Sequence, residues 1–272
     1  MSGGAGVVYY DKFKELLVSR RGRLFTIQFH RPAVQNALRR RTVFELLRAL
    51  DIANYEPDVS VVVLTGDATA FTAGMDISEV QELQQKSGVE AVDVHFNASS
   101  LIVLSVVKKM LVNRKVLVAL VQGNCVGIGV PLCALCDIVY ATETANFWMP
   151  FTKLGICAES GASWTLPQLL GHSKASELLL FGERMDARTA LQYGFVANIV
   201  SSATEFWARM EQHAQLPTAA LLATKRLLQH SRREQLIDVV NLENIHVKQL
   251  RTTPYFRAQI MAFGKRKNQS KL

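Results

Sequence analysis

The sequence predicts an α/β protein, in which an α/β core of about 200 residues is followed by an all-helical region. Short apolar runs of strand length alternate with segments of helical periodicity up to Pro150. Beyond Pro150 the pattern becomes mainly helical, and beyond Pro217 it is entirely helical. No internal repeat or low-complexity linker interrupts the chain, so we expect the core to span residues 1–200 and the helical region residues 201–272.

Four segments have the pattern of strands. Apolar and polar residues alternate in 24–29, which predicts a half-buried strand, whereas the continuous apolar runs at 60–65, 116–121 and 137–140 predict buried strands. Helical patterns in the core lie at 40–54, 77–85, 89–112 and 127–135. Further helices are expected at 160–170, 173–181, 187–192, 203–214, 218–230, 232–249 and 254–264.

The composition is that of an ordinary soluble globular protein. The chain has 272 residues, 49% hydrophobic and 20% charged, which excludes wholesale disorder and supports a core without disulfide or metal staples. The apolar runs at 116–121 and 126–135 are shorter than the ~20 residues that cross a bilayer, so we expect no membrane span. The six histidines show no metal-ligand spacing, and we expect no bound metal.

The net charge of +8 is carried partly by basic clusters. No zinc-finger spacing, RNA-recognition signature or aromatic-interleaved basic stripe accompanies them, so solvated helix faces are favoured over nucleic-acid binding. An anionic ligand such as a nucleotide-bearing molecule stays open. The clusters are Arg39, Arg40 and Arg41; Arg232 and Arg233; and Lys265, Arg266 and Lys267.

The cysteines and the two termini indicate the cellular compartment in which we expect the protein. Cys133 and Cys136 form a C-x-x-C pair inside an apolar run, where we expect them to be buried thiols rather than a metal or redox site. The amino terminus lacks the basic and apolar regions of a secretory signal, which favours a reducing compartment. The chain ends in Ser270, Lys271 and Leu272, a tripeptide that the peroxisomal import receptor reads as an address.

Two strand-to-helix junctions are rich in glycine and other small residues. In 66–76 a strand runs into a small-residue loop, with Asp76 as the expected N-cap of the next helix. In 121–129 a second strand ends and glycines introduce a helix. Glycine permits a ligand to approach the backbone closely, and a helix start leaves N–H groups unpaired. Two such loops can direct two N–H groups at one oxygen, forming an oxyanion hole.

Several motifs, in this order, resemble the crotonase (enoyl-CoA hydratase/isomerase) superfamily over nearly the whole chain. They lie at 30–38 (HRPAVQNAL), 71–77 (FTAGMDI), 123–129 (GNCVGIG) with 136–140 (CDIVY), and 181–196. The resemblance implies a spiral of ββα turns with a C-terminal helical trimerisation region, assembled as a homotrimer or a dimer of trimers. It also implies an acyl-CoA substrate and no separate cofactor, since CoA is part of the substrate.

The resemblance also implies site residues. The thioester oxygen is expected between the backbone N–H groups of Met75 and Ile128; the family more often has glycine at the second of these positions. The substrate is expected to contact Ala73, Gly74, Met75, Asp76, Ile77 and Ile128.

The carboxylates suggest which reaction is carried out. Hydration of a 2-enoyl thioester needs two carboxylates, and the positions of the family's two hydratase glutamates are here Pro131 and Phe151. Neither residue ionises, which disfavours a simple hydratase. The segment 151–167 instead resembles peroxisomal Δ3,Δ2-enoyl-CoA isomerases, which carry a single glutamate at the position of Glu159.

A single base is sufficient for a 1,3-proton shift, because Glu159 can remove the C2 proton of a 3-enoyl thioester and return it at C4. We expect an apolar surround to raise the pKa of Glu159. The alternative is that Glu159 lies in the first turn of a helix, where its charge suits the helix dipole. The expected apolar neighbours are Phe151, Ile156, Ala158 and Trp164.

Other polar residues have weaker claims to a catalytic role. Asp137 is expected to be structural and Glu143 an exposed turn residue. His95 and Asn97 lie on the helix expected to roof the acyl pocket, where Asn97 is a candidate for holding a water near Glu159.

The favoured function is a Δ3,Δ2-enoyl-CoA isomerase of fatty-acid β-oxidation, located in peroxisomes or a related organelle such as the glycosome. The alternatives are another crotonase-family enzyme (a thioesterase, a dienoyl-CoA isomerase or a weak hydratase) and a non-catalytic acyl-CoA-binding module.

Overall fold

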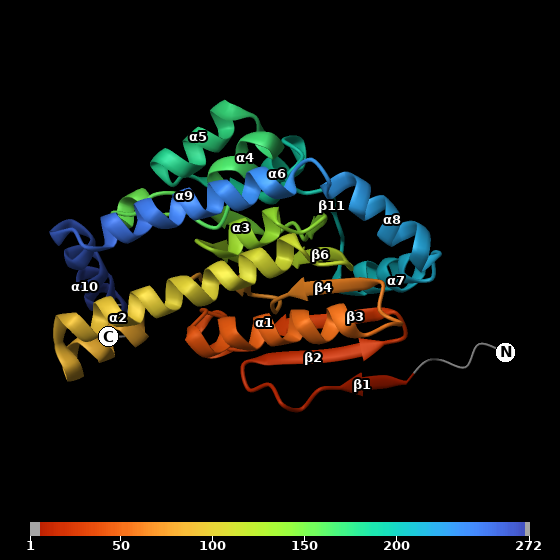
Figure 1. Ribbon diagram of the computed structural model, residues 1–272, viewed down its shortest axis with the longest axis horizontal. Helices are drawn as coiled ribbons and strands as arrows, with labels where there is room; N and C mark the ends of the chain where they lie inside the picture. The colour runs from red at the N-terminus through yellow and green to blue at the C-terminus, as the bar shows by residue number, and fades with distance from the viewer. Residues whose placement is uncertain (1–5, 270–272) are drawn as a thin grey trace.

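The computed structural model describes residues 6–269, except for the side chains of residues 81–93, 97 and 263–269. The fold is built on two β-sheets (Figure 1). The first is seven-stranded, in the order β1 (Val7–Tyr9), β2 (Leu16–Arg21), β3 (Leu24–Phe29), β4 (Val61–Thr65), β6 (Val116–Val121), β8 (Ile138–Ala141) and β11 (Asn198–Ile199). The second is four-stranded, in the order β10 (Arg184–Asp186), β9 (Asn146–Trp148), β7 (Asn124–Val126) and β5 (Ala70–Thr72).

Successive segments of the chain add one strand to each sheet and then a helix. β4 joins the first sheet, β5 the second, and helix α2 (Ile77–Leu111) follows; β6, β7 and α3 (Gly129–Ala134) repeat the pattern. β8 and β9 repeat it again, before the 3-10 helix η2 (Thr152–Leu154) and α4 (Ala162–Leu170). Because β4, β6 and β8 are parallel, as are β5, β7 and β9, each turn lies beside the previous one. The predicted α/β class with its ββα spiral is confirmed.

The remaining helices lie before and after these turns. The 3-10 helix η1 (Pro32–Val34) and α1 (Arg40–Tyr55) precede them. The helices that follow α4 are α5 (His172–Phe181), α6 (Ala187–Gln192), α7 (Ala203–Ala214), α8 (Thr218–Gln229), α9 (Arg233–Arg251) and α10 (Pro254–Gln269). The chain is thus helical from α7 to α10, and α9 and α10 fold back to pack against α2 (Figure 1).

The continuous apolar run of β4 is explained by burial on both faces of the large sheet. Val62 and Leu64 belong to the main core, which also contains side chains of α1 and α2. Val61 and Val63 point the other way and pack in a second core with Phe206 of α7. A strand covered on both sides does not alternate in polarity.

The expected strands agree with the structure to within one residue at each end, but two other predictions need correction. The helices expected at 77–85 and 89–112 are one 35-residue helix, α2, because a glycine such as Gly88 weakens a helix without ending it. The short strands of the second sheet were not predicted, because three residues carry too little periodicity.

Helix α2 also qualifies the expectation about membranes. The part Val94–Leu111 is long and apolar enough, by length and composition alone, to cross a bilayer. In the structure α2 packs against α1, α9 and α10 and lines an internal cavity, as the core helix of a globular protein does. The absence of a membrane span stays a prediction.

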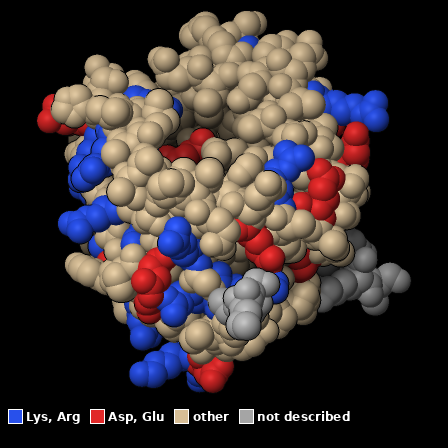
Figure 2. Space-filling view, turned by 90° about the vertical axis from the view of Figure 1, so that its right-hand side faces the viewer, with Lys and Arg blue, Asp and Glu red and all other residues tan. Residues whose placement is uncertain are grey.

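The basic surplus is dispersed on the face that Figure 2 shows. Lys and Arg side chains lie among Asp and Glu side chains there and form no continuous basic band. This distribution is consistent with solvated helix faces.

Candidate active site

A cavity of about 160 Å³ lies between the carboxyl ends of the second sheet's strands and helices α2, α9 and α10. All the residues predicted to bind substrate or act in catalysis line it: Ala73, Gly74, Met75, Asp76, Ile77, Ile128 and Glu159. The C-terminal helical region also contributes to the wall, through Val240, Asn244, Arg251, Phe256 and Ile260. The cavity is therefore not confined to residues 1–200.

The two glycine loops lie against each other because they follow neighbouring parallel strands, β5 and β7. Gly74 and Gly127 both have positive φ, of 85° and 56°, which glycine adopts without steric cost. A Cβ atom on Gly74 would lie 3.1 Å from the carbonyl oxygen of Val126, so the loops meet where a side chain would be crowded. Each glycine is followed by one of the predicted amide donors, Met75 or Ile128.

The N–H groups of these two donors are free. Neither Met75 nor Ile128 donates a hydrogen bond to any group in the part of the chain that the structure describes. The preceding glycines do donate: Gly74 N–H to Thr72 Oγ1 at 3.1 Å, and Gly127 N–H to the carbonyl of Trp148 at 2.9 Å. The loops are thus anchored one residue before each free amide.

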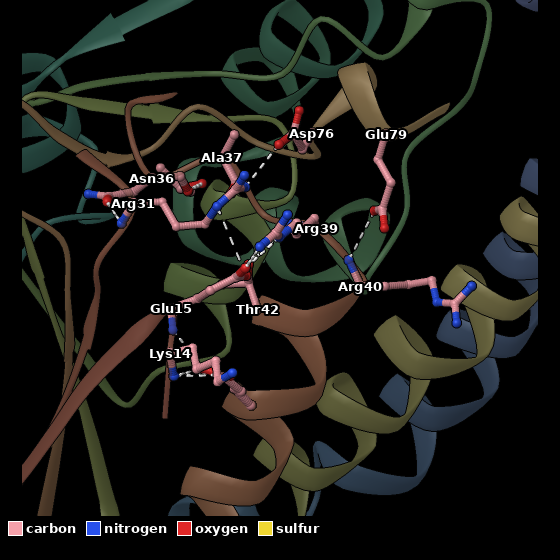
Figure 3. Close-up of polar contacts among 12 residues, drawn as sticks. Lys14, Glu15, Arg31, Asn36, Ala37, Arg39, Arg40, Thr42, Asp76 and Glu79 are labelled. Atoms are coloured by element: carbon pink, nitrogen blue, oxygen red, sulfur yellow. Dashed lines mark hydrogen bonds and ion pairs between the residues drawn. The ribbon is translucent and has the colours of Figure 1, made fainter. Parts of the chain in front are cut away.

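The early HRPAVQNAL motif braces the first loop. The carbonyl of Gly74 accepts from the N–H of Leu38 at 2.8 Å, and the N–H of Asp76 donates to the carbonyl of Leu38 at 2.9 Å. Arg31 Nη1 lies 2.9 Å from Asp76 Oδ2. Figure 3 shows Arg31 between Asp76 and Glu15, which also pairs with Arg39. The family resemblance pointed to this motif, but its role in supporting the first loop was not predicted.

Asp76 is the N-cap of α2, as predicted. Its Oδ1 accepts from the backbone N–H of Ser78 at 3.2 Å. Burial alone raises the pKa of Asp76, but the hydrogen bonds from Ser78 and the ion pair with Arg31 outweigh it and hold the pKa below its ordinary value. Asp76 is therefore an ionised brace of the loop and a poor proton acceptor.

Glu159 lies in the loop before α4, whose N-cap is Gly161. It is therefore outside the first turn of the helix, contrary to the alternative placement. Its side chain is only 12% exposed, and its Oε2 lies 3.3 Å from Nη2 of Arg251. Burial raises the pKa of Glu159, Arg251 lowers it and nearby Glu243 raises it, with a net upward shift. The predicted direction is confirmed, although the cation was not foreseen.

Two charged residues of α9 near Glu159 were missed by the sequence analysis. Arg251 lies over the ring of Phe96 at 5.3 Å and donates to Ser100 Oγ, both on α2. Glu243 is buried and accepts from the N–H of Gly161 at 2.6 Å and of Ser163 at 2.9 Å, at the start of α4. No motif in the sequence relates Arg251 and Glu243 to Glu159. That a predicted helix carries acidic and basic residues does not by itself indicate a partner for a distant glutamate.

The apolar surround of Glu159 differs in part from the prediction. Phe151 and Ile156 line the cavity, but Ala158 and Trp164 do not. Trp164 lies beneath the guanidinium of Arg232, 5.3 Å from ring centroid to Cζ, because α4 turns this side chain toward the start of α9. The apolar lining comes mainly from α2 and α10 instead, with Val103, Leu104, Val107, Phe256 and Ile260.

The other polar candidates fall outside a catalytic arrangement. His95 lines the cavity, and burial lowers its pKa, which favours the neutral imidazole. Asp137 is structural, since it pairs with Lys225 at 2.7 Å, and Glu143 is an exposed residue paired with Arg188. The side chain of Asn97 lies outside the described residues, as do Ser270, Lys271 and Leu272.

The thiols and histidines are the groups on which a metal site would depend. Among the side chains that the structure describes, no cluster of His, Cys, Asp and Glu has the arrangement of metal ligands. Cys133 is buried and Cys136 partly buried, and both are free thiols whose pKa is raised by burial.

The sequence and the fold match a known family. Residues 20–270 match the family model described as enoyl-CoA hydratase/isomerase. The chain belongs to this family of enzymes.

Individual relatives include both isomerases and a hydratase. The chain is 32% identical to enoyl-CoA delta isomerase 2 of Homo sapiens over 240 residues, covering 87% of this chain and 59% of the relative. The rat protein of that name is also 32% identical, over 82% of this chain and 56% of the relative. The chain therefore spans less than two thirds of these isomerases. It is 33% identical to 2,3-dehydroadipyl-CoA hydratase of Escherichia coli, covering 80% of this chain and 82% of the relative.

Solved structures agree in fold. An enoyl-CoA hydratase/isomerase from Mycobacterium paratuberculosis superposes with a TM-score of 0.85 at 27% identity, covering 93% of this chain and 100% of that chain. One from Pseudoalteromonas atlantica has a TM-score of 0.81 at 28% identity, over 93% and 98% of the two chains.

Proposed function

We propose that the protein is a Δ3,Δ2-enoyl-CoA isomerase that moves a double bond from C3 to C2 of an acyl-CoA. One observation carries the proposal: a buried carboxylate of raised pKa, Glu159, lines the same cavity as the two free amides of Met75 and Ile128. Asp76 in this cavity is held by Arg31, and Glu79 is 34% exposed and accepts from the N–H of Arg40 at 3.3 Å. Glu159 is therefore the carboxylate best placed to act as a base.

The proposed reaction is a 1,3-proton shift. The thioester oxygen accepts hydrogen bonds from the N–H groups of Met75 and Ile128, which stabilise the negative charge that develops when Glu159 removes the C2 proton. The resulting dienolate takes the same proton back from Glu159 at C4, which leaves a conjugated 2-enoyl thioester. An oxyanion donor of this kind contributes about 2.7–4 kcal/mol to transition-state stabilisation.

Hydration is disfavoured by the residues at two positions. Water addition needs a base and an acid, and Phe151 fills part of the cavity wall while Pro131 lies inside α3. Hydration of a 2-enoyl-CoA should nevertheless be measured beside isomerisation, because the E. coli relative is named a hydratase. The thioesterase and acyl-CoA-binding alternatives are outcomes of the same test.

The location and assembly are part of the proposal. The tripeptide Ser270, Lys271 and Leu272 supports import into peroxisomes or glycosomes by the peroxisomal receptor, and a role in fatty-acid β-oxidation. A mouse relative, 31% identical over 83% of this chain and 70% of its own length, is named peroxisomal enoyl-CoA delta isomerase 3. A homotrimer or a dimer of trimers is the proposed assembly, and the exposed Leu227 and Leu228 of α8, at 77% and 69%, offer it an apolar contact surface.

The test is to mix the protein with a trans-3-enoyl-CoA and follow the conjugated product by ultraviolet absorbance. Glu159→Gln keeps the shape of the side chain and removes the base, so we expect a fall in kcat of about 100-fold or more. Glu143→Gln, at an exposed ion pair, is the matched control and should keep wild-type activity.

Three outcomes would contradict the proposal. Hydration of a 2-enoyl-CoA faster than isomerisation would make the protein a hydratase. Release of free CoA without isomerisation would make it a thioesterase. Acyl-CoA binding without turnover would leave a binding module.

A further inference from the structure

Helix α9 contacts the loop of Glu159 at two points, eight residues apart along one helix. Near its middle, Glu243 accepts hydrogen bonds from the backbone at the start of α4, immediately after Glu159. At its C-terminal end, Arg251 contacts the Glu159 carboxylate itself. Residues eight apart lie about 80° apart around a helix axis, so both contacts come from one broad side of α9.

We propose that Arg251 is a positioning residue for the reaction, holding the Glu159 carboxylate ionised and oriented before the substrate is deprotonated. The inference rests on the proposed role of Glu159 as the base. Arg251 contacts that base and need not contact the substrate.

The geometry of Arg251 suits orientation of one oxygen only. Its Nη2 lies 3.3 Å from Oε2 of Glu159, while its Nη1 donates to Ser100 Oγ on α2. Oε1 of Glu159 accepts no hydrogen bond from the side chains and backbone described. One carboxylate oxygen is therefore held by the cation, and the other keeps its lone pairs for a proton.

A purely structural role would not explain this pair. Desolvation of two buried charges commonly costs more than their attraction returns, and apolar side chains of similar size stabilise such interfaces as well or better. Helices α2 and α9 already pack through apolar residues such as Val107 and Val240. The pairing of Arg251 with Glu159 in this apolar cavity is better explained by the effect of Arg251 on the charge and orientation of the catalytic base.

Among the described side chains, Arg251 is the cation that acts directly on Glu159. Burial is the largest influence and raises the pKa of Glu159; Arg251 lowers it, and Glu243 raises it. The single contact at 3.3 Å offsets burial only in part, so the carboxyl stays more basic than an exposed glutamate. Of the side chains that the structure describes, the other titratable groups at or near the cavity include Cys157 in the same loop, Asp76 at the start of α2, and Glu79 and His95 on α2.

The experiment compares Arg251→Gln, Arg251→Lys and a matched control, Arg232→Gln, by the pH profile of kcat/KM for a trans-3-enoyl-CoA. Arg232 is the N-cap of α9, at the opposite end of the helix from Arg251. Its guanidinium also lies 5.3 Å from the centroid of an aromatic ring, but it has no contact with Glu159 among the described interactions. We expect the acid limb to move to higher pH in Arg251→Gln, with kcat/KM about 100-fold below wild type at pH 6 and within about tenfold at pH 9. Arg251→Lys keeps the charge and should retain the wild-type limb, as should Arg232→Gln.

A second measurement is independent of activity. When folding raises the pKa of a carboxyl, the folded state binds the proton more tightly than the unfolded state does. The protein therefore loses stability as the pH rises from the pKa of the unfolded state to the pKa of the folded state. Without Arg251 this loss should be larger, so Arg251→Gln should become less stable than wild type toward pH 9. The loss should vanish in the Arg251→Gln, Glu159→Gln double variant, which carries no uncompensated charge and is expected to fold even where the single variant does not.

The outcomes separate this inference from the proposed function. An Arg251→Gln pH profile with the wild-type midpoint, or equal pH dependence of unfolding in the single and double variants, would overturn the role of Arg251. Absence of isomerase activity in wild type, with the unfolding pattern as expected, would overturn the isomerase and leave the charge coupling between Arg251 and Glu159 intact.

Discussion

Gly74 approaches Val126 so closely that a Cβ atom added to the glycine would lie 3.1 Å from the valine carbonyl oxygen. The contact joins the two loops that carry the amides of Met75 and Ile128. Gly74→Ala must therefore shift one loop by a few tenths of an ångström and also adopt a positive φ of 85°. We expect kcat to fall about 100-fold, as when one oxyanion donor is lost, and stability to fall by about 1–2 kcal/mol.

The variant Gly171→Ala separates the effect of backbone strain from the effect of crowding between the two loops. Gly171 has a similar φ of 74°, but no atom lies within 4 Å of an added Cβ. With a ψ of 158° this backbone conformation is essentially restricted to glycine, so the alanine variant should lose stability in chemical denaturation and keep wild-type kcat. Equal loss of activity in both variants would show that backbone strain, rather than the contact between the loops, lowers turnover.

The pH dependence of the wild-type enzyme follows from Glu159. Burial raises the pKa of Glu159 above the ordinary value, and a base must be ionised to accept a proton. We therefore expect kcat/KM to rise with pH, with a midpoint above the glutamate reference of about 4.3. A midpoint at or below that reference would contradict the assignment of this limb to Glu159.

The same shift predicts a stability difference. Because the folded state holds the Glu159 proton more tightly, its contribution is present below the unfolded pKa and lost as pH rises through the folded pKa. Glu159→Gln should match wild type in acid and be more stable at pH 8, as measured by urea denaturation. A constant difference across pH would point to a packing effect instead.

Glu243→Gln should act on Glu159 in the direction opposite to loss of Arg251. The negative charge of Glu243 raises the pKa of Glu159, so its removal should move the acid limb of kcat/KM to lower pH. Stability should also fall by about 2 kcal/mol, because an amide replaces the charged acceptor of the Gly161 and Ser163 N–H groups. An acid limb that moves to higher pH would refute the charge effect.

The ion pair between Lys225 of α8 and Asp137 fastens the helical region to the large sheet. Lys225 is 4% exposed, its Nζ lies 2.7 Å from Asp137 Oδ2, and it also donates to the carbonyl of Lys115. Lys225→Met should cost about 3 kcal/mol, the low end for a broken buried pair because Asp137 keeps some contact with solvent. Adding Asp137→Asn should recover part of that loss; a more severe defect in the double variant would contradict the pairing.

Long apolar runs and helical periodicity were sufficient to predict β3, β4, β6 and β8 of the large sheet and most of the helices, but not β1, β2 and β11. Strands such as β6, buried on both faces, have a signal that does not depend on the rest of the fold. β5 and β7 are three residues each, and their pairing depends on the spiral that brings them together. Their existence was implied by the family resemblance rather than by their own sequence.

The site was predictable to the extent that it is local in sequence. Met75, Ile128 and Glu159 each lie in a recognisable motif, and the structure brings them to one cavity. Arg251 is 92 residues from Glu159 in sequence, and a basic residue at the end of a helix is ordinarily a solvated one. Only the packing of α9 on α2 identifies it as a partner of the base.

The late position of α9 and α10 in the chain has a consequence for biogenesis. Both sheets are built from residues before 200, which leave the ribosome first. Arg251, Phe256 and Ile260 emerge later, and the cavity closes only when they dock against α2. Until residues 233–260 have been made, the apolar residues beside Glu159 lack the helices that cover them, so this apolar surface stays exposed to solvent during synthesis.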